Sequence, residues 1–214
     1  MTLLSQSEDM RRNMVDSQLR TSGVNAPWIL AAMLATPREN FVTDANSAVY
    51  MDRSFPLGDG RMLNPPLAAG QMLMAADPKP TDRILLIGAG TGYLAALLAR
   101  RVTFIVAVEE SPKLAEICAT THSSVQLLCS AHNAGAPDHA PFDLIIIDGA
   151  VEEFPLTLAD QLTDGGRVVV GITDGPVSRL ATGVKRGSQL ALRTVMDMEI
   201  ATLPGFARAK EFVF

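Results

Sequence analysis

The sequence predicts a doubly wound α/β fold, in which helices cover both faces of a mostly parallel sheet, preceded by a helical extension. Three observations lead to this class. From residue 83 onward short apolar runs alternate with stretches of helical spacing, several runs are apolar throughout, and a glycine-rich turn joins the first run to the first helix. Strands that are apolar along their whole length are typical of a parallel sheet that is covered on both sides.

The individual elements follow from the period of the apolar residues. The expected strands are 84–87, 104–108, 125–129, 144–147 and 168–172, and the expected helices between the first of them are 92–101 and 112–121. The tail, 174–214, has no clean helical period. We therefore expect it to add antiparallel strands at one edge of the sheet.

The first part of the chain is expected to be helical. Apolar residues recur at helical spacing in 9–22 and in 26–35. Asn25 shortly precedes Pro27, which predicts an N-cap followed by proline in the first turn. Pro37 is expected to end this second helix, because a helix rarely continues through proline.

A segment rich in glycine and proline follows in residues 52–66. Proline removes a backbone donor and fixes φ, and glycine permits turns that other residues resist, so the segment is expected to be a positioned loop. Such loops often carry function. We divide the chain into 1–75, the helical extension with this loop, and 76–214, the α/β domain, and we expect one compact unit.

Composition and charge narrow the class of function. The chain has 214 residues, 48% of them apolar, and a formal net charge of −5. Its basic residues form scattered pairs and no long run, so a nucleic-acid partner is not expected. No apolar run approaches the roughly 20 residues of a membrane helix, and the start, with Glu8 and Asp9, does not resemble a signal peptide. We expect a cytoplasmic protein without a membrane partner; the sequence carries no signal for its oligomeric state.

The cysteines and histidines show no spacing typical of metal ligands. Cys118 and Cys129 are the two cysteines, and both stand among apolar residues, so buried free thiols are expected. The histidines are His122, His132 and His139, and they share no ligand spacing with the cysteines.

The clearest functional signal is the glycine loop 88–92, which follows the first expected strand. It reads Gly88-Ala89-Gly90-Thr91-Gly92 and opens a helix. Glycines let a ligand approach the backbone, and a helix start offers unpaired N–H groups. The loop lacks the Gly-Lys-Ser/Thr ending of a P-loop, and Tyr93 stands where a dinucleotide fingerprint has its third glycine. A purely structural glycine turn is the alternative.

An acidic residue stands at the end of the second expected strand. Glu109 follows Gly88 by 21 residues, a distance at which a carboxylate can accept both hydroxyls of an adenosine ribose. Strand alternation after Val106 and Val108 leaves Glu110 as a competitor for this role. A solvated carboxylate at the strand end is the alternative interpretation.

Several further motifs occur in an order that can be compared with a known family. They are 14–20 (MVDSQLR), Pro37-Arg38 with Phe41-Val42, Tyr50 with Asp52, 58–66 (GDGRMLNPP), 141–146 (PFDLII) and 164–167 (DGGR). On these motifs the chain from Met14 to about Gly171 resembles the protein-L-isoaspartate O-methyltransferase family, whose substrate loop is usually written GHGQTISQP. That family has the Rossmann-like class I methyltransferase fold, and the resemblance favours Glu109 over Glu110.

The resemblance implies a cofactor, a substrate class and a set of site residues. The cofactor is S-adenosylmethionine, with S-adenosylhomocysteine as product, and the substrate is a protein or peptide carboxylate, as in protein repair. The implied catalytic residues are Asn64 in the substrate loop and Asp148 after the fourth strand, with no metal. The implied cofactor-binding residues are Leu63, Gly88, Ala89, Gly90, Thr91, Gly92, Glu109, Ser130 and Ala131.

The sequence departs from the family pattern at positions that bear on activity. Met62 and Asn64 stand where the family has Thr and Ser, and Leu86 stands where it has an acidic residue. After the third strand, 129–131 reads CSA in place of the usual GDG, whose Asp helps to hold adenine. We therefore predict weaker side-chain contact with adenine, and slow or absent isoaspartyl methylation.

The chemistry itself asks for positioning rather than for a strong base. An aspartyl carboxylate, with a pKa of about 3.9, is already ionised at neutral pH. Asn64 could anchor it through amide N–H donors, with Pro65 restricting the backbone. The alternative is an asparagine that caps its own turn.

Two further aspartates leave a different reaction open. Asp148 and Asp174 follow the fourth and fifth expected strands, whose ends face one crevice. They could hold Mg²⁺, as in metal-dependent small-molecule O-methyltransferases, or simply be solvated. Three functions therefore remain: a carboxyl methyltransferase of the isoaspartyl type, a methyltransferase on another acceptor such as a small molecule, and a catalytically weakened cofactor-binding or interaction protein.

Overall fold

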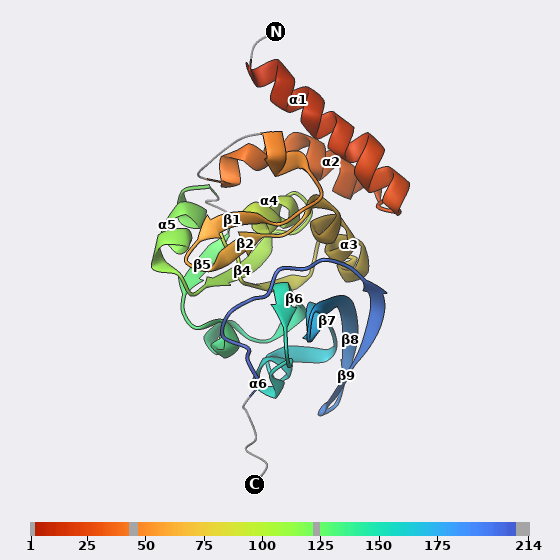
Figure 1. Ribbon diagram of the computed structural model, residues 1–214. Coiled ribbons are helices and arrows are strands. Elements are labelled where there is room, and N and C mark those ends of the chain that lie inside the picture. The colour runs from red at the N-terminus through yellow and green to blue at the C-terminus, as the bar shows by residue number, and fades with distance from the viewer. Residues whose placement is uncertain (1–2, 43–46, 122–124, 209–214) are drawn as a thin grey trace.

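The chain forms the doubly wound α/β fold that its periodicity predicts, in a computed structural model that describes residues 3–42, 47–121 and 125–208 (Figure 1). A seven-stranded sheet has the order β5-β4-β3-β6-β7-β8-β9. Its strands are β3 (Arg83–Ile87), β4 (Phe104–Glu109), β5 (Gln126–Cys129), β6 (Phe142–Val151), β7 (Leu162–Asp174), β8 (Val177–Arg186) and β9 (Gln189–Asp197). The pairings from β5 to β7 are parallel, and those of β8 and β9 are antiparallel. The expected antiparallel edge is thus confirmed.

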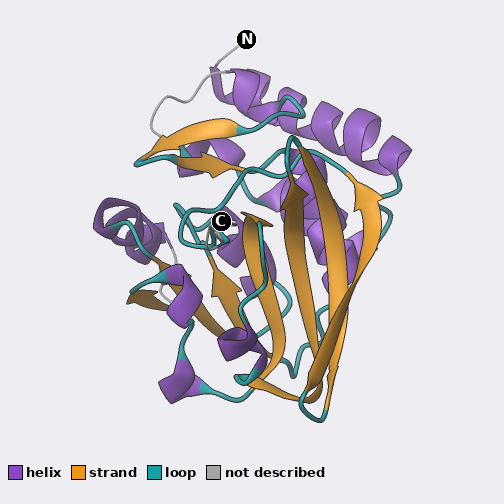
Figure 2. Ribbon diagram, turned by 60° about the horizontal axis from the view of Figure 1, so that its bottom comes forward, coloured by secondary structure: helices purple, strands orange, loops and turns teal. Residues whose placement is uncertain are grey.

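The strands are apolar throughout because the sheet has a hydrophobic core on each face. Neighbouring residues of β3 alternate between the two, with Ile84 and Leu86 in one core and Leu85 and Ile87 in the other. The first core is completed by α2 (Pro27–Ala35), α3 (Pro66–Ala76), α4 (Tyr93–Ala99) and α5 (Pro112–Thr121), and the second by the short α6 (Leu156–Ala159) and by residues near the C-terminal end. Figure 2 shows the sheet between these layers.

The N-terminal part packs onto the first core. Helix α1 (Leu3–Asn13) continues into a π-helical turn, Met14–Leu19, and α2 follows. The prediction that Asn25 is the N-cap of α2 is wrong. Ala26 occupies that position, its backbone is extended, and no side chain caps the helix that begins at Pro27. Helix α3 was not predicted, because it is buried almost all round and has no polar face to set a helical period.

The predicted loop 52–66 contains a small antiparallel hairpin of β1 (Phe55–Gly58) and β2 (Arg61–Leu63). Its turn uses positive φ at Gly58, Asp59 and Gly60, at 96°, 50° and 70°. The hairpin forms a sheet of its own. It is therefore held on the molecule by side-chain contacts and not by pairing with the large sheet.

The two cysteines differ in burial. Cys118 is buried on α5, as expected, whereas Cys129 is exposed. The expectation of a buried Cys129 is wrong because β5 is the outermost parallel strand and only partly covered. None of the described helices is long and apolar enough to cross a membrane.

A buried arginine ties the N-terminal part to the end of the hairpin. Arg38 is fully buried, its Nε donates to the carbonyl oxygen of Val49 at 2.8 Å, and a terminal nitrogen donates to the carbonyl of Asn64. Its guanidinium carbon also lies 4.8 Å from the ring centre of Tyr93. Burial lowers the pKa of Arg38, a shift that nearby Tyr93 and Asp148 oppose.

We predict that Arg38→Met lowers the free energy of unfolding by about 2–4 kcal/mol, because two buried carbonyls lose their donor. Urea unfolding at neutral pH measures this change. Arg53→Met is the matched control, since Arg53 is exposed and should change stability by less than about 0.5 kcal/mol. Equal effects of the two substitutions would contradict the anchoring role of Arg38.

Candidate functional site

The predicted strand–turn–helix order around the glycine loop 88–92 is present. The loop leaves β3 and enters α4, and Gly88, Gly90 and Gly92 have positive φ of 78°, 56° and 97°. Residues other than glycine resist these values, which accounts for the alternation in the sequence. The N–H groups of Gly88 and Ala89 both donate to the carbonyl of Val108, at 2.9 and 3.1 Å, so the loop is fastened to β4.

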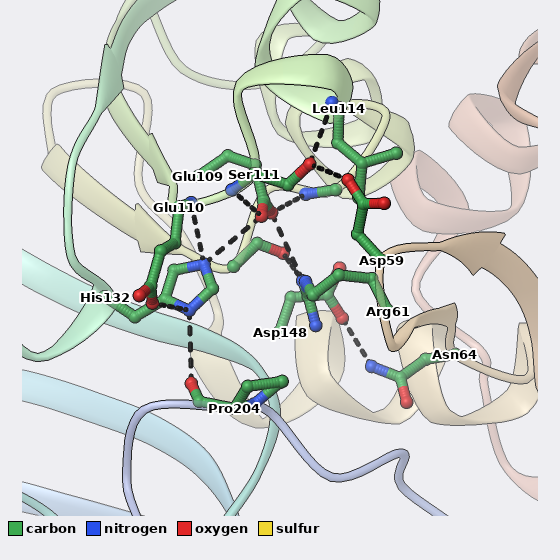
Figure 3. A network of polar contacts seen from close by, with 12 residues as sticks. Asp59, Arg61, Asn64, Glu109, Glu110, Ser111, Leu114, His132, Asp148 and Pro204 are labelled. Atoms are coloured by element: carbon green, nitrogen blue, oxygen red, sulfur yellow. Dashed lines mark hydrogen bonds and ion pairs between the residues drawn. The ribbon is translucent and has the colours of Figure 1, made fainter.

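Glu109, at the end of β4, is the carboxylate that meets this loop (Figure 3). It is fully buried; its Oε2 accepts the N–H of Gly90 at 2.7 Å and its Oε1 that of Ser111 at 3.1 Å. The side chain of Glu110 is 51% exposed. Strand alternation thus points Glu109, and not Glu110, at the glycine loop.

Arg61 is a site residue that the sequence did not reveal. From β2, its NH2 donates to the carbonyl of Gly88 at 2.9 Å and lies 3.3 Å from Glu109 Oε2. Its side chain is 4% exposed, and its Nε has no hydrogen-bond partner. The only signal in the sequence was a cation within the segment 58–66, whose one other side-chain donor is Asn64.

His132 is the second site residue that the sequence did not reveal. It is buried, its Nε2 accepts the N–H of Glu110 at 3.1 Å and lies 3.4 Å from Glu109 Oε1, and its Nδ1 lies 3.2 Å from the carbonyl oxygen of Pro204. Its ring stacks on Phe206 at 6.5 Å between centres. Its position just after the third parallel strand was the available signal.

The surroundings of Glu109 stabilise its charged form. Burial by itself raises the pKa of a carboxyl group, but His132, the charge of Arg61 and the N–H of Ser111 outweigh this effect. Together they lower the pKa of Glu109 to about 2. Glu109 is therefore an ionised acceptor throughout the neutral range.

The two predicted catalytic residues lie in contact with each other. Asn64 Nδ2 donates to Asp148 Oδ1 at 2.6 Å, and Asn64 Oδ1 accepts the N–H of Ala201 at 2.8 Å. Burial raises the pKa of Asp148, against the opposing effects of Asn64 and of the nearby arginines Arg61 and Arg38. Both ends of the Asn64 amide thus have protein partners, and its role toward a substrate stays a prediction.

Residues 200–206, here called the C-terminal strap, cross the carboxyl ends of the strands. The strap is fixed to β6, because the N–H of Ala150 donates to Ala201 and the N–H of Leu203 donates to Ala150, each at 2.8 Å. A Cβ on Gly149 would lie 2.7 Å from Leu203 Cβ, so this close crossing needs glycine. The strap brings Leu203 and Pro204 to the site.

The remaining predicted cofactor residues lie around the same strand ends. Ser130 Oγ is buried and has no hydrogen-bond partner, and its contact with a cofactor stays a prediction. Ala131 precedes the turn that carries His132. Leu63 is buried in the hairpin, and Thr91 donates its hydroxyl to the carbonyl of Phe41 at 2.6 Å, so that hydroxyl serves the scaffold.

The two aspartates considered for a metal point into different surroundings. Asp148 is bonded to Asn64, whereas Asp174 lines a separate polar cavity of about 550 Å³ with Glu152 and Arg179. Within 3–42, 47–121 and 125–208, no three or more His, Cys, Asp or Glu side chains are grouped so that they could hold a metal ion.

A cavity of about 260 Å³ opens beside Glu109; its walls are Asp59, Arg61, Glu109, Glu110, Ser111, His132 and Pro204. It is small for a ligand pocket, which usually measures 300–1,000 Å³. The residues nevertheless suit S-adenosylmethionine: the glycines permit close approach, Glu109 is an ionised acceptor for ribose hydroxyls, and the Ser130 hydroxyl is unpaired.

We predict that Glu109→Gln removes an acid-sensitive part of the stability. A lowered pKa means that the charged carboxylate stabilises the fold above its ordinary pKa of 4.5, by roughly 3 kcal/mol. This contribution is lost as the pH falls through 4.5 toward 2, so the two proteins should differ by only roughly 1 kcal/mol near pH 3. Urea unfolding at pH 7, 5 and 3 measures the difference; a constant difference would contradict the lowered pKa.

The comparisons with known proteins point to one family. The sequence profile described as protein-L-isoaspartate(D-aspartate) O-methyltransferase (PCMT) matches residues 10–205. A protein-L-isoaspartate O-methyltransferase of Koribacter versatilis is 31% identical over 201 residues, covering 91% of this chain and 90% of that protein. Another, of Aeropyrum pernix, is 34% identical over 207 residues, covering 92% and 79%.

Solved structures show the same likeness. A protein-L-isoaspartate O-methyltransferase superposes with a TM-score of 0.79 at 28% identity, over 91% of this chain and 66% of that chain. A Plasmodium falciparum β-aspartate methyltransferase (PCMT), solved with S-adenosyl-L-homocysteine, shares the fold with a TM-score of 0.76 at 16% identity, over 93% and 98%. These matches do not favour another class of methyltransferase or a non-catalytic module. With its profile match and its relatives above 30% identity, the chain belongs to the protein-L-isoaspartate(D-aspartate) O-methyltransferase family of S-adenosylmethionine-dependent methyltransferases.

Proposed function

We propose that this protein methylates isoaspartyl carboxylates of damaged proteins or peptides in the cytoplasm, at the crevice between the glycine loop and the hairpin. The observation that carries the proposal is the position of Glu109. This buried, ionised carboxylate accepts an N–H of the glycine loop and lines a cavity, in a chain that belongs to this family. Neither a basic surface run nor a grouped metal site among the described residues points to a different substrate class.

The residues around the cavity would divide the binding of the cofactor between them. Glu109 would accept the ribose hydroxyls, and the unpaired hydroxyl of Ser130 would meet the adenine edge. Because Gly88 and Gly90 carry no side chain, they would let a ligand that displaces the neighbouring side chains lie close to the backbone. When bound, S-adenosylmethionine supplies the methyl group that the acceptor carboxylate receives.

The protein's part in the reaction is to orient an acceptor that is already a nucleophile. An ionised carboxylate needs no general base, so a lost anchor lowers the rate through poorer orientation. Asn64 is bonded to Asp148 and to the strap, and Met62 has no donor. The residue positions that carry hydroxyls in the family loop thus offer little to an acceptor here, which supports a slow isoaspartyl reaction.

Methyl transfer to an isoaspartyl peptide tests the proposal directly. With isotopically labelled S-adenosylmethionine, we expect slow labelling of the isoaspartyl peptide and none of the same peptide with ordinary aspartate. Glu109→Gln should weaken S-adenosylhomocysteine binding in calorimetry by roughly 10- to 100-fold, as for a lost charged acceptor. Tight binding of S-adenosylhomocysteine without labelling of either peptide would contradict the proposed isoaspartyl substrate. It would leave the proposed cofactor standing.

We predict that Met62→Thr raises kcat/KM for the isoaspartyl peptide several-fold, because it restores a hydroxyl without breaking the bond from Asn64 to Asp148. Met62 is half-buried on β2 opposite Pro56, so the substitution is tolerable there. Met51→Thr, at a methionine that is 53% exposed, is the control and should change nothing. No gain from Met62→Thr would show that position 62 does not face the acceptor.

A further inference from the structure

The guanidinium of Arg61 occupies two acceptors of the cofactor site at once. One nitrogen, NH2, donates to the carbonyl of Gly88 at 2.9 Å and lies 3.3 Å from Glu109 Oε2 (Figure 3). The side chains of both charged residues are almost fully buried, at 4% and 0% exposed. The pair is therefore part of the interior and is little screened by salt.

Glu109 cannot accept two ribose hydroxyls while this pair exists. A carboxylate offers about four lone-pair directions on two oxygens. Both directions of Oε2 are taken, by the N–H of Gly90 and by Arg61. Oε1 accepts the N–H of Ser111 and keeps one direction open, because the nearby Nε2 of His132 is itself an acceptor of a backbone N–H. A second ribose hydroxyl can bond to this carboxylate only when a partner of Oε2 leaves.

Arg61 is the partner that can leave. The N–H groups of Gly90 and Ser111 belong to the short turns between β3 and α4 and between β4 and α5, which the elements on either side hold in place. Arg61 stands instead on the separate hairpin, at the longer distance of 3.3 Å, and its Nε has no partner to lose. Asp59, on the turn of the same hairpin, lines the same cavity and offers a carboxylate to a displaced guanidinium.

Arg61 also covers the open side of the glycine loop. A Cβ added to Gly88 would lie 3.1 Å from Arg61 NH2 and 2.8 Å from Leu203 Cδ1. The space that glycine leaves for a ligand is therefore filled by the chain's own side chains. The family's loop, GHGQTISQP, has an uncharged Gln in the place of Arg61, which could not form this ion pair.

We propose that Arg61 is a built-in competitor of the cofactor, which holds Glu109 in the free protein and must be displaced before the adenosine ribose binds. The inference rests on the proposed function in one respect, that S-adenosylmethionine and its product are the ligands. It assigns Arg61 the role of setting cofactor affinity. A product that leaves would be replaced at Glu109 by the same guanidinium.

Calorimetry with S-adenosylhomocysteine tests this role without depending on methyl transfer. Arg61→Gln keeps a polar but shorter side chain and removes the charge, so it should tighten binding about tenfold, which corresponds to ~1.4 kcal/mol. In thermal unfolding, the same variant should have a lower Tm than the unmodified protein when no ligand is present, because the free protein loses the ion pair with Glu109. Saturating S-adenosylhomocysteine should raise its Tm by more than it raises that of the unmodified protein, because the ligand-bound state does not contain this ion pair.

Two matched variants control the experiment. Arg53→Gln removes the same charge from an exposed position just before the hairpin, and its affinity should equal that of the unmodified protein. Arg61→Lys keeps the charge on a shorter side chain, so its ammonium should reach the two acceptors less well. It should tighten binding by a smaller factor, about threefold, and it serves in place of Arg61→Gln if that variant does not fold.

The outcomes separate this inference from the proposed function. Tighter binding by Arg61→Gln, or binding by that variant alone, supports competition. Measurable binding by the unmodified protein with equal or weaker binding by both Arg61 variants overturns the competitor and leaves the proposed function standing. If none of these proteins binds S-adenosylhomocysteine, both the competitor role of Arg61 and the proposed function are overturned. If Arg53→Gln tightens binding as much as Arg61→Gln does, the effect is due to net charge and the competitor role is overturned.

Discussion

The pairing of Arg61 with Glu109 is the interaction on which the arrangement of the site depends. A two-stranded hairpin is at best marginally stable alone, and β1 and β2 pair only with each other. The hairpin keeps its place because Leu57 and Leu63 are buried and because Arg61 and Asn64 reach the ends of the large sheet. The apolar contacts provide attraction without direction, whereas the two polar contacts fix which side of the glycine loop the hairpin covers.

The same contacts explain why two buried carboxylates titrate in opposite directions. Glu109 faces His132, the guanidinium of Arg61 and the N–H of Ser111, which together outweigh the cost of burial and lower its pKa to about 2. Asp148 has one neutral donor within bonding distance, Asn64, and the nearby arginines do not offset the cost of its burial, so its pKa rises. The number of donors, rather than depth alone, decides the charge of each group. The site therefore holds one carboxylate whose pKa is lowered and, next to it, one carboxyl group whose pKa is raised.

Much of the fold could be predicted from the sequence, and the site could be predicted only in part. The apolar strands, the glycine loop and Glu109 are encoded locally, by period and by spacing. Arg61 and His132 meet Glu109 from 48 and 23 residues away in the chain, and no local pattern predicts that contact. Cys129 was misplaced for a similar reason, since its exposure depends on β5 being an edge strand.

The departures from the family loop share one physical consequence. Arg61 and Asn64 direct their polar groups inward, to Glu109 and Asp148, where they stabilise the folded chain. A donor that is engaged in this way is not available to a ligand unless the internal bond is broken first, and the free energy of that bond is then subtracted from the affinity. Stability of the free protein and affinity for its ligands thus draw on the same few groups. A loop of this composition commits its polar groups to the protein's own carboxylates, so that a ligand has to compete with these bonds.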